Sequence, residues 1–270
     1  LVLAAGGIRP AISIPATDME TTVGSPSVDI EIIDMLDRFQ ACYIDDQATE
    51  DDADVITVNY GTWGPGLETT IDGAVSATLG LQNLFSCTAI SNTRFAAFWF
   101  DDASNDATFS LRNENGAAII PLTDMDINVG ETGQVAITSL NNNYFAMGWY
   151  DSASQNIQIA MRDINNNIIL APTVIDANAG TSSRVAMATL KNSSESLDWF
   201  AVAWNDRNAN NIQAVIYDSL GILRHGPFIL ADDENTTSLL FDVYGKDTLI
   251  NPLPSTQTSI CDNKFIFSYT

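Results

Sequence analysis

A recurring aromatic pattern constrains the fold of this 270-residue chain more than any other feature. Each copy has a Phe, an aromatic residue four positions later and, in most copies, an Asp two positions after that. The copies begin at Phe39, Phe95, Phe145, Phe200 and Phe265, at intervals of about 50 to 65 residues. Self-similarity at such a period is typical of repeat architectures, so we expect a chain built from similar structural units.

The residues inside each copy indicate a β-strand. With a period of two, Phe95 and Trp99 point to one face while Phe98 and Phe100 point to the other. Both faces are therefore apolar, as in a strand at the middle of a small sheet that is packed on both sides. A helix would instead distribute these aromatic side chains around its whole circumference.

Further short apolar runs flank each aromatic strand and complete a four-stranded unit. Turns rich in Asn, Asp and Gly separate the third run from the fourth. Four antiparallel strands, repeated around an axis, predict an all-β fold of the β-propeller type. The expected first strands are 85–90, 135–140 and 185–190; the third are 55–60, 107–112, 157–162 and 212–217; the fourth are 118–122, 168–174 and 222–230.

The two ends of the chain are predicted to share one blade. Residues 7–14 resemble the fourth strand at 221–230, and 1–5 then fit a third strand. Residues 239–244 and 265–269 fit a first and a second strand. Five blades follow, closed by both termini, which removes free sheet edges; the alternative is a slice of a six- to eight-bladed ring. The expected single domain has blades at approximately 26–82, 83–132, 133–182 and 183–238, and a shared blade at 1–25 plus 239–270.

The repeat resembles the tandem propeller repeats of secreted and surface proteins of bacteria and archaea, of the form F-V-V-A-W-x-D followed by I-x-A-x-x-Y-D-x-x-G. FAVAWND from Phe200 and IQAVIYDSLG from Ile212 carry the resemblance most fully. It covers nearly the whole chain and implies the fold, and it implies parts of large exported adhesins or repeat proteins. Five-bladed propellers also include animal lectins and a large clan of glycoside hydrolases.

The charge balance narrows the possible partners. With 34 acidic against 11 basic residues, the net charge of −23 repels phosphate backbones and anionic lipid headgroups. No apolar run is long enough to span a membrane. The acidity fits an extracellular or cell-surface location, high salt or calcium loading, and equally a surface that is merely solubilising. The chain opens on Leu1, so a processed mature chain and a fragment both stay open.

The three cysteines and two glycosylation triplets decide little. Cys42 and Cys87 lie in apolar strand patterns as small hydrophobes, and with Cys261 they leave one disulfide possible. The N-x-[ST] triplets at Asn192 and Asn235 are as many as chance produces.

Carboxylates on innermost strands are the feature that a propeller glycoside hydrolase would need. Three of the expected innermost strands contain none, and the candidates are Asp29, Glu31, Asp34 and Asp242. Two of these could act as an acid and a base, or all could form a solvated or paired edge of the central funnel. His225, the single histidine, follows a turn between outer strands and is expected at the surface, which disfavours a catalytic triad.

Acidic loops between second and third strands would cluster on one rim of the ring. Such oxygen ligands could hold calcium, with residues 45–54 the best candidate. Asp and Asn are also ordinary hairpin residues, and none of the loops matches the spaced calcium-loop motif. The candidate metal ligands are Asp45, Asp46, Glu50, Asp51, Asp52, Asp54, Asp101, Asp102 and Asp106.

Trp63 lies among glycines in a predicted turn. It could stack on a sugar ring beside nearby carboxylates, or cap a blade edge. The insertion at 246–263 is a candidate for individual specificity.

These features favour a non-catalytic extracellular propeller that serves as a structural or adhesion module in a surface assembly. A carbohydrate-binding propeller, with Trp63, Asp29, Glu31 and Asp242 near the ligand, is the first alternative, and a five-bladed glycoside hydrolase is the second. Expected partners are proteins of the assembly or surface glycans. Calcium is the one cofactor for which the sequence offers ligands.

Overall fold

The computed structural model describes residues 30–34, 38–46, 51–59, 65–72, 85–101, 104–130, 134–140, 143–181, 183–190, 198–232, 241–246 and 264–269. Within these ranges the chain forms strands and turns and no helix. Accordingly, no helix among these residues is suited to crossing a bilayer.

The described strands form four sheets of four antiparallel strands and one sheet of two. Strands pair in chain order within each sheet, so every four-stranded sheet is a meander. We call the sheets blades 1 to 5. Their strands are β1 Ile30–Asp34, β2 Arg38–Asp46, β3 Asp51–Asn59 and β4 Pro65–Asp72; β5 Phe85–Ser91, β6 Arg94–Asp101, β7 Asp106–Asn113 and β8 Ala118–Asp126; β9 Gln134–Ser139, β10 Tyr144–Asp151, β11 Asn156–Asp163 and β12 Ile168–Asp176; β13 Val185–Leu190, β14 Trp199–Asp206, β15 Asn211–Asp218 and β16 Leu223–Asp232; and β17 Phe241–Lys246 with β18 Lys264–Tyr269.

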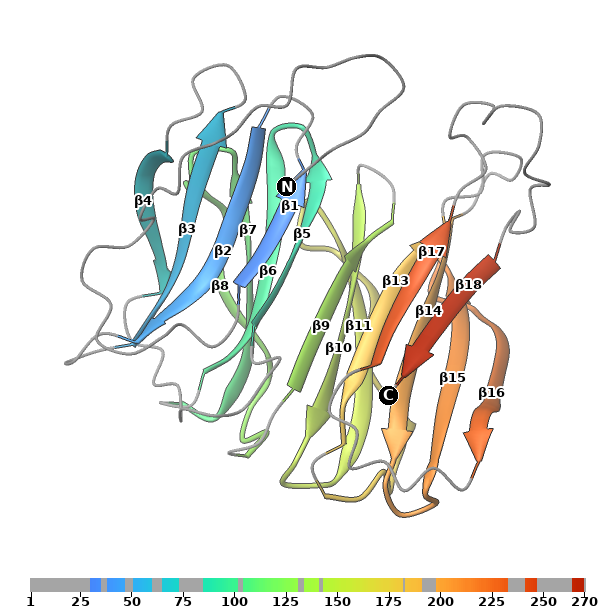
Figure 1. Ribbon diagram of the computed structural model, residues 1–270. Coiled ribbons are helices and arrows are strands. Elements are labelled where there is room, and N and C mark those ends of the chain that lie inside the picture. Colours follow the sequence, from blue (N-terminus) through green and yellow to red (C-terminus); the bar gives the residue numbers. More distant parts are fainter. Residues whose placement is uncertain are drawn as a thin grey trace, which may run out of the picture.

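The blades are arranged around a common axis with their first strands innermost (Figure 1). The innermost strands contact one another in the order β1, β5, β9, β13 and β17. Consecutive meanders that meet through their first strands and face one another broadside form a β-propeller. Each blade hides a face against its neighbour, which a single four-stranded sheet cannot do alone.

The predicted aromatic strands are confirmed as the second strand of each described sheet, β2, β6, β10, β14 and β18. The strand expected at 239–244 begins two residues later, at Phe241, and pairs with β18. The strands expected at 1–5 and 7–14 lie outside the described residues. The predicted loop at 45–54 was too long, because β2 and β3 pair up to Asp46 opposite Asp51.

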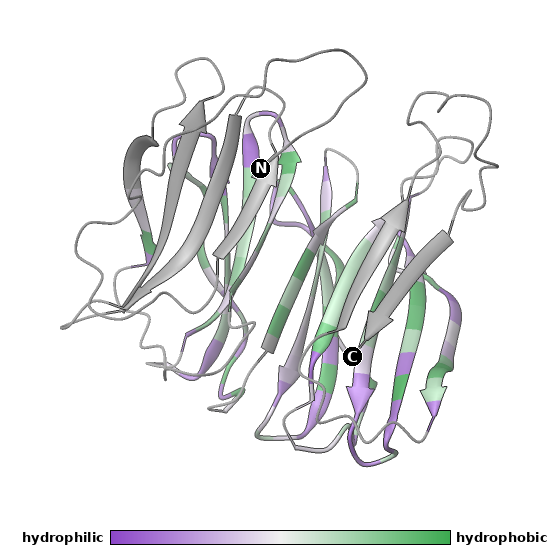
Figure 2. Cartoon of the chain, viewed as in Figure 1, coloured by the Kyte–Doolittle hydropathy of each residue, from purple (hydrophilic) through white to green (hydrophobic). Residues whose placement is uncertain are grey.

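Aromatic residues of the second strands fill the spaces between blades. Trp99, Trp149 and Trp204 are fully buried. The rings of Phe98 and Trp149, from blades 2 and 3, meet edge to face with their centroids 5.9 Å apart. Trp149 thus packs between blades 2 and 3. Figure 2 shows the same division, with hydrophobic segments inside the strands and hydrophilic ones at the turns.

The outermost strands have a different character from the rest. Within the described side chains, every exposed large hydrophobic residue lies on or directly beside β8, β12 or β16, or in the turn that leads into β16. Each of these strands also contains a proline, which lacks the N–H that edge-to-edge strand pairing requires. The prolines are Pro121, Pro172 and Pro227. The perimeter is therefore apolar in side chains but poorly suited to the addition of another strand.

Candidate functional site

The acidic turns between second and third strands are the first candidate site, and in blades 2 to 4 the described carboxylates at the ends of the second strands bind groups of the turns themselves. Asp101 accepts a hydrogen bond from the Ser104 hydroxyl at 2.8 Å. The equivalent Asp151 accepts bonds from the N–H groups of Ala153 and Ser154, at 2.9 and 3.1 Å. Asp206 accepts the Ala209 N–H at 2.8 Å. These aspartates stabilise tight turns by accepting from groups of the turn, a hydroxyl for Asp101 and backbone N–H groups for Asp151 and Asp206.

Among the predicted metal ligands, only Asp101 and Asp106 have described side chains. Asp106 accepts the N–H of Asn128 at 3.1 Å, which ties the turn to the chain leaving the same blade. The described residues contain no group of three acidic, His or Cys side chains that could hold a metal ion. Asp45 and Asp46 end β2 and Asp51, Asp52 and Asp54 lie in β3; Glu50 and Asp102 lie outside the described residues.

A second set of polar side chains caps the turns between third and fourth strands. The side-chain oxygen of Asn113 accepts the N–H groups of Asn115 and Ala117, both at 2.9 Å. Asp163 and Asp218 make the same pair of bonds in blades 3 and 4. The three turns thus share one capping geometry built on two backbone donors, to which the Asn167 side chain adds a further bond to Asp163 at 2.8 Å in blade 3.

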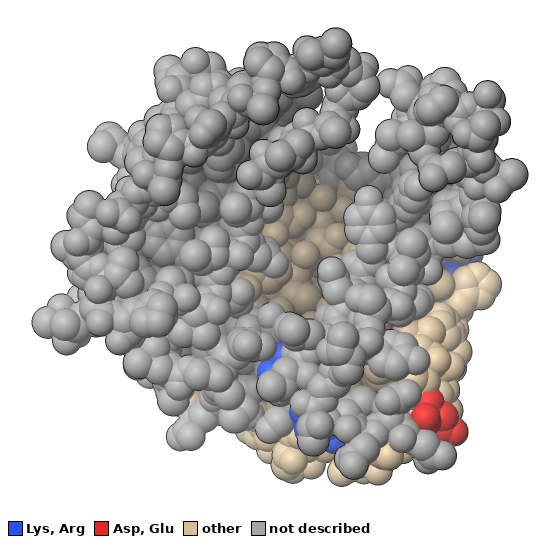
Figure 3. Space-filling view, viewed as in Figure 1, with Lys and Arg blue, Asp and Glu red and all other residues tan. Residues whose placement is uncertain are grey.

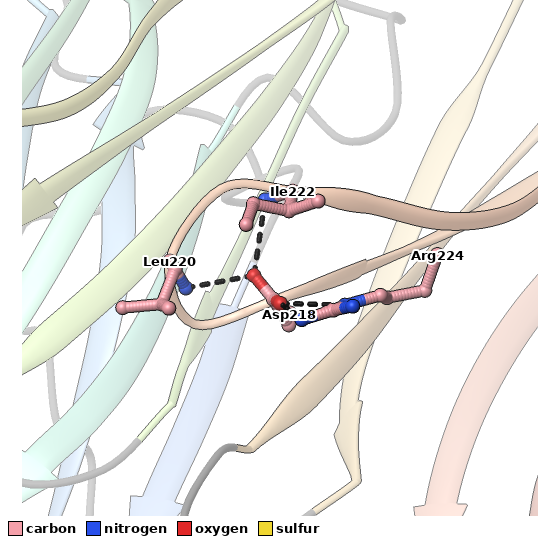
Figure 4. Close-up of polar contacts among 4 residues, drawn as sticks. All are labelled: Asp218, Leu220, Ile222 and Arg224. Carbon is pink, nitrogen blue, oxygen red and sulfur yellow. Dashed lines mark hydrogen bonds and ion pairs between the residues drawn. The ribbon is translucent and has the colours of Figure 1, made fainter.

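The cap of blade 4 carries an additional ion pair. Asp218 is fully buried, and its second oxygen accepts the Nε of Arg224 at 2.6 Å (Figure 4). Leu220 and Ile222, whose N–H groups bind the first oxygen, extend their side chains away from the carboxylate in the same view.

The cap of blade 3 lowers the pKa of its own carboxylate. Desolvation raises the pKa of Asp163, but hydrogen bonds from Asn167 and Asn165 outweigh it, and the net pKa lies below the ordinary value.

Tryptophan–aspartate hydrogen bonds join consecutive blades. The indole Nε1 of Trp149 in blade 3 donates to Asp126 at the end of blade 2, at 3.0 Å. Trp204 in blade 4 repeats the arrangement with Asp176 of blade 3, at 2.8 Å. The carboxylates at the ends of β8 and β12 are therefore elements of the joints between blades.

The joint between blades 1 and 2 departs from this arrangement. Trp99 is fully buried, yet its Nε1 has no hydrogen-bond partner among the described residues. Asp72, at the position equivalent to Asp126, instead lies near the guanidinium of Arg112, which donates to the Ile71 carbonyl at 2.8 Å. Burial lowers the pKa of Arg112 and the charge of Asp72 opposes this. At this joint Arg112 of blade 2 links the two blades.

Hydroxyl groups, and not carboxylates, link the innermost strands of blades 2 to 4. The N–H of Ile137 donates to the Ser86 hydroxyl at 3.3 Å, and that of Ser139 donates to Thr88 at 3.2 Å. The hydroxyls of Thr138 and Thr189 lie 2.9 Å apart. Neutral hydroxyls therefore satisfy edge donors that face the next blade. At the centre of the molecule Figure 3 shows a hollow whose visible described atoms belong to residues other than Lys, Arg, Asp and Glu.

The predicted acidic residues of the funnel lie on the remaining two innermost strands. Glu31 and Asp34 are in β1, and Asp242 is in β17. Asp29 lies outside the described residues. β1 contacts β5, and β17 contacts β13, so these strands stand at the two ends of the described series of innermost strands.

The aromatic candidate Trp63 lies outside the described residues. A pair that the sequence analysis did not single out, Trp199 and His225, lies on blade 4 with ring centroids 5.8 Å apart. His225 is exposed, as predicted. Cys87 is a buried thiol in β5, which agrees with its prediction as a small hydrophobe.

Sequence reasoning missed the joints between blades. The signal was present, because Asp72, Asp126, Asp176 and Asp232 all end outer strands. Aligning these four positions with the tryptophan of the following blade would have suggested a contact. The difference between Trp149, which has an acceptor, and Trp99 has no such signal, since both tryptophans occupy the same position of the repeat.

Comparison with known proteins gives distant structural likeness only. No protein-family model matches the chain, and no curated protein matches it. Among solved structures, the α-L-arabinofuranosidase of Podospora anserina in complex with cellotriose has a TM-score of 0.40 at 11% identity, over 78% of this chain and 69% of that one. The catalytic domain of the GH62 α-L-arabinofuranosidase of Coprinopsis cinerea has a TM-score of 0.39 at 8% identity, over 78% and 70%. Likeness at this level does not carry the activity of either enzyme to this chain.

Proposed function

We propose that the chain is a non-catalytic propeller that serves as a structural or adhesion module of an extracellular or cell-surface assembly. The observation that carries the proposal is the use of its polar groups. The described Asp side chains at the turns and blade joints accept hydrogen bonds that build the ring, as Asp151 and Asp126 do. A catalytic carboxylate would instead face an open site where it can reach a substrate.

The innermost strands support the same proposal. Propeller hydrolases need acidic residues from several blades around the axis, and β5, β9 and β13 contain none. Their hydroxyls bond to neighbouring strands, as Ser86 does with the Ile137 N–H. Three adjacent blades therefore contribute support and no acid–base group to the centre.

We further propose that the ring has five blades and that residues 1–14 complete blade 5 as its third and fourth strands. The support is the two-stranded sheet β17–β18, which supplies the first two strands of a blade, together with the likeness of 7–14 to the fourth strand of blade 4. A sheet edge left open would favour aggregation.

The test is hydrolysis of a broad panel of aryl glycosides and polysaccharides by the purified chain. The control is a variant with Asp29→Asn, Glu31→Gln, Asp34→Asn and Asp242→Asn. We expect no turnover in either protein. Turnover that the substitutions abolish would overturn the proposal in favour of a glycoside hydrolase.

A carbohydrate-binding propeller is the second candidate, and the pair of Trp199 and the exposed His225 favours it. Sugar rings stack on aromatic faces that lie at a surface. A glycan array separates the candidates: binding that Trp199→Ala or Trp63→Ala removes would favour the lectin-like function, and the structural module is expected to bind none.

A further inference from the structure

The sequence contains a single Asn-Gly pair, Asn115–Gly116, and it lies in the turn between β7 and β8. Asn115 is exposed, and the cap of this turn binds its backbone N–H and not its side-chain amide. In an Asn-Gly pair the backbone nitrogen of the glycine can attack the side-chain carbonyl carbon of the asparagine, because no Cβ on the glycine shields that nitrogen. The turn therefore holds both groups of a spontaneous ring closure.

The fold requires the glycine but not the asparagine. Gly116 has φ of +80°, and a Cβ atom there would lie 2.7 Å from the Cγ2 of Thr69 in blade 1. Another residue at this position would be strained and would collide with the neighbouring blade. The residue before it is variable, because the same position of the blade 4 cap is occupied by Leu220. The reactive pair is therefore no requirement of the cap.

The turn of blade 3 has the same backbone with a different second residue. Asn165 is followed by Asn166, whose φ of +66° is also left-handed. The Asn166 N–H donates to the Asp163 carbonyl at 3.0 Å, as the Gly116 N–H donates to the Asn113 carbonyl at 2.9 Å. Either nitrogen must lose this bond before it can attack, and exposed turns open at a low cost in free energy. The two turns thus differ in the Cβ beside the attacking nitrogen.

The Asn-Gly turn is part of the joint between blades 1 and 2. The Gly116 carbonyl accepts Nη1 of Arg112 at 3.0 Å, and Nη2 of the same guanidinium donates to the Ile71 carbonyl of blade 1 at 2.8 Å. This is also the joint in which Nε1 of the buried Trp99 has no partner among the described residues. A change in backbone length at Asn115 would displace the carbonyl that holds Arg112.

We propose that Asn115 is a site of spontaneous deamidation, and that the product weakens the joint between blades 1 and 2. The Gly116 nitrogen loses its proton and bonds to the side-chain carbon of Asn115, and the amide nitrogen leaves as ammonia. Water then opens the resulting succinimide at one of its two carbonyls, which gives aspartate or isoaspartate. Isoaspartate adds a methylene to the backbone between the two N–H donors of the cap.

The reaction needs only water, and no group is oxidised or reduced. The inference goes beyond the proposed function, because it concerns how the ring ages and holds whether the chain is a structural module, a lectin or a hydrolase.

The experiment is prolonged incubation of the full chain in mildly alkaline buffer, followed by digestion at acidic pH and peptide mapping by mass spectrometry. We expect the peptide with Asn115 to gain the mass of an amide-to-acid change at least about tenfold faster than the peptide with Asn165, a barrier lower by about 1.4 kcal/mol. Electron-transfer fragmentation identifies isoaspartate among the products. The Tm of the aged chain should fall by a few degrees relative to the fresh chain.

Two variants separate the chemistry from its consequence. Asn115→Gln keeps the backbone donor of the cap, so it should fold normally, keep its mass at this turn and keep its Tm on ageing. Leu220→Asn places an asparagine before Gly221 in the equivalent cap of blade 4, and it should create a second reacting turn.

Two outcomes would overturn the proposal. The first is an Asn115 amide that persists as long as that of Asn165, because the missing Cβ would then have no effect in the folded turn. The second is a Tm that falls equally in the aged wild type and in aged Asn115→Gln, because the loss of stability would then arise elsewhere.

Discussion

Single carboxylates hold the turns in place and join neighbouring blades. Asp126 and Asp176 accept indole N–H groups from the following blade, and Asp163 and Asp218 shape turns. Hydrogen bonds to ionised groups stabilise more than neutral ones, particularly away from water. The strongly acidic composition thus has a structural component besides any role in solubility.

The tryptophan joints allow a controlled comparison. Trp149→Phe and Trp204→Phe should each lower the free energy of unfolding by about 1 to 3 kcal/mol more than Trp99→Phe. All three substitutions remove the same atoms from fully buried sites, but only Trp149 and Trp204 lose a hydrogen bond to a carboxylate. Urea denaturation measures the difference. Equal losses in the three variants would show that these bonds do not contribute.

The cap of blade 3 predicts a pH dependence. Because the folded pKa of Asp163 lies below its unfolded value, its stabilisation is present above the unfolded pKa of about 4 and is lost as pH falls through the folded pKa. The stability difference between wild type and Asp163→Asn should therefore shrink between about pH 5 and pH 2.

Asn113→Asp in blade 2 is the converse test, because Asn113 makes the same cap without a charge. It should acquire the pH dependence that Asp163→Asn loses. Urea midpoints at several pH values measure both. A difference between wild type and Asp163→Asn that is constant with pH would contradict the assigned pKa direction.

At this scale the sequence predicted residue classes better than contacts. The alternation of Phe95 with Trp99 indicated burial, and both are fully buried. That Trp149 has an acceptor and Trp99 has none depends on whether Asp72 lies toward an indole or toward Arg112. Such competition between two partners is set by tertiary geometry, which a motif does not encode.

Among the elements, the close approach of loops to neighbouring blades limits substitution. Gly180, in the connection from β12 to β13, has φ of +84°, and a Cβ there would lie 2.9 Å from the backbone N of Asn208. Gly148 in β10 lies equally near a neighbour, but that neighbour is the flexible side chain of Met187.

We expect Gly180→Ala to lower the free energy of unfolding by about 1 to 3 kcal/mol, because neither the φ angle nor a backbone atom can adjust cheaply. Gly148→Ala should cost less, because Met187 can change rotamer. Thermal and urea unfolding of the two variants give the comparison. A Gly148→Ala variant that is the less stable of the two would contradict this account.

Strand prediction succeeded where apolar alternation was strong and failed at strand ends. The second strands were located to within a residue or two, whereas β3 begins at Asp51, well before its apolar part. Backbone pairing with β2 extends the hairpin beyond the hydrophobic residues from which the strand was predicted. The polar ends of β8 and β12, which reach Asp126 and Asp176, were missed for the same reason.

The whole molecule has a net charge of −23, so its acidic groups repel one another in the folded state. Self-repulsion destabilises the compact state, and salt screens it. Raising NaCl from about 0.05 to 0.5 M should raise the Tm by a few degrees, as measured by differential scanning fluorimetry. An unchanged Tm would indicate that the charges are too widely spaced to matter.

Calcium at matched ionic strength extends this measurement to the acidic hairpin at 45–54. A further rise in Tm that Asp51→Asn with Asp52→Asn abolishes would identify a cation site there, and equal values in the two salts would argue against one.

The repeat predicted the propeller because it is a property of every blade, and the four meanders agree with it. The site was less accessible to sequence reasoning. Gly221 of blade 4 packs against Leu170 of β12, and nothing in either segment alone indicates the other.

The shared turn cap also has a use in protein engineering. Since Asn113, Asp163 and Asp218 all hold their turns through the same two backbone N–H groups, the side chains two and four positions later can differ between blades while this cap is kept. At these positions the three turns, which have the same cap, contain Asn, Ala, Leu and Ile. These positions form a ready series of display sites around the perimeter, on which libraries could be selected for new recognition while the scaffold is left unaltered.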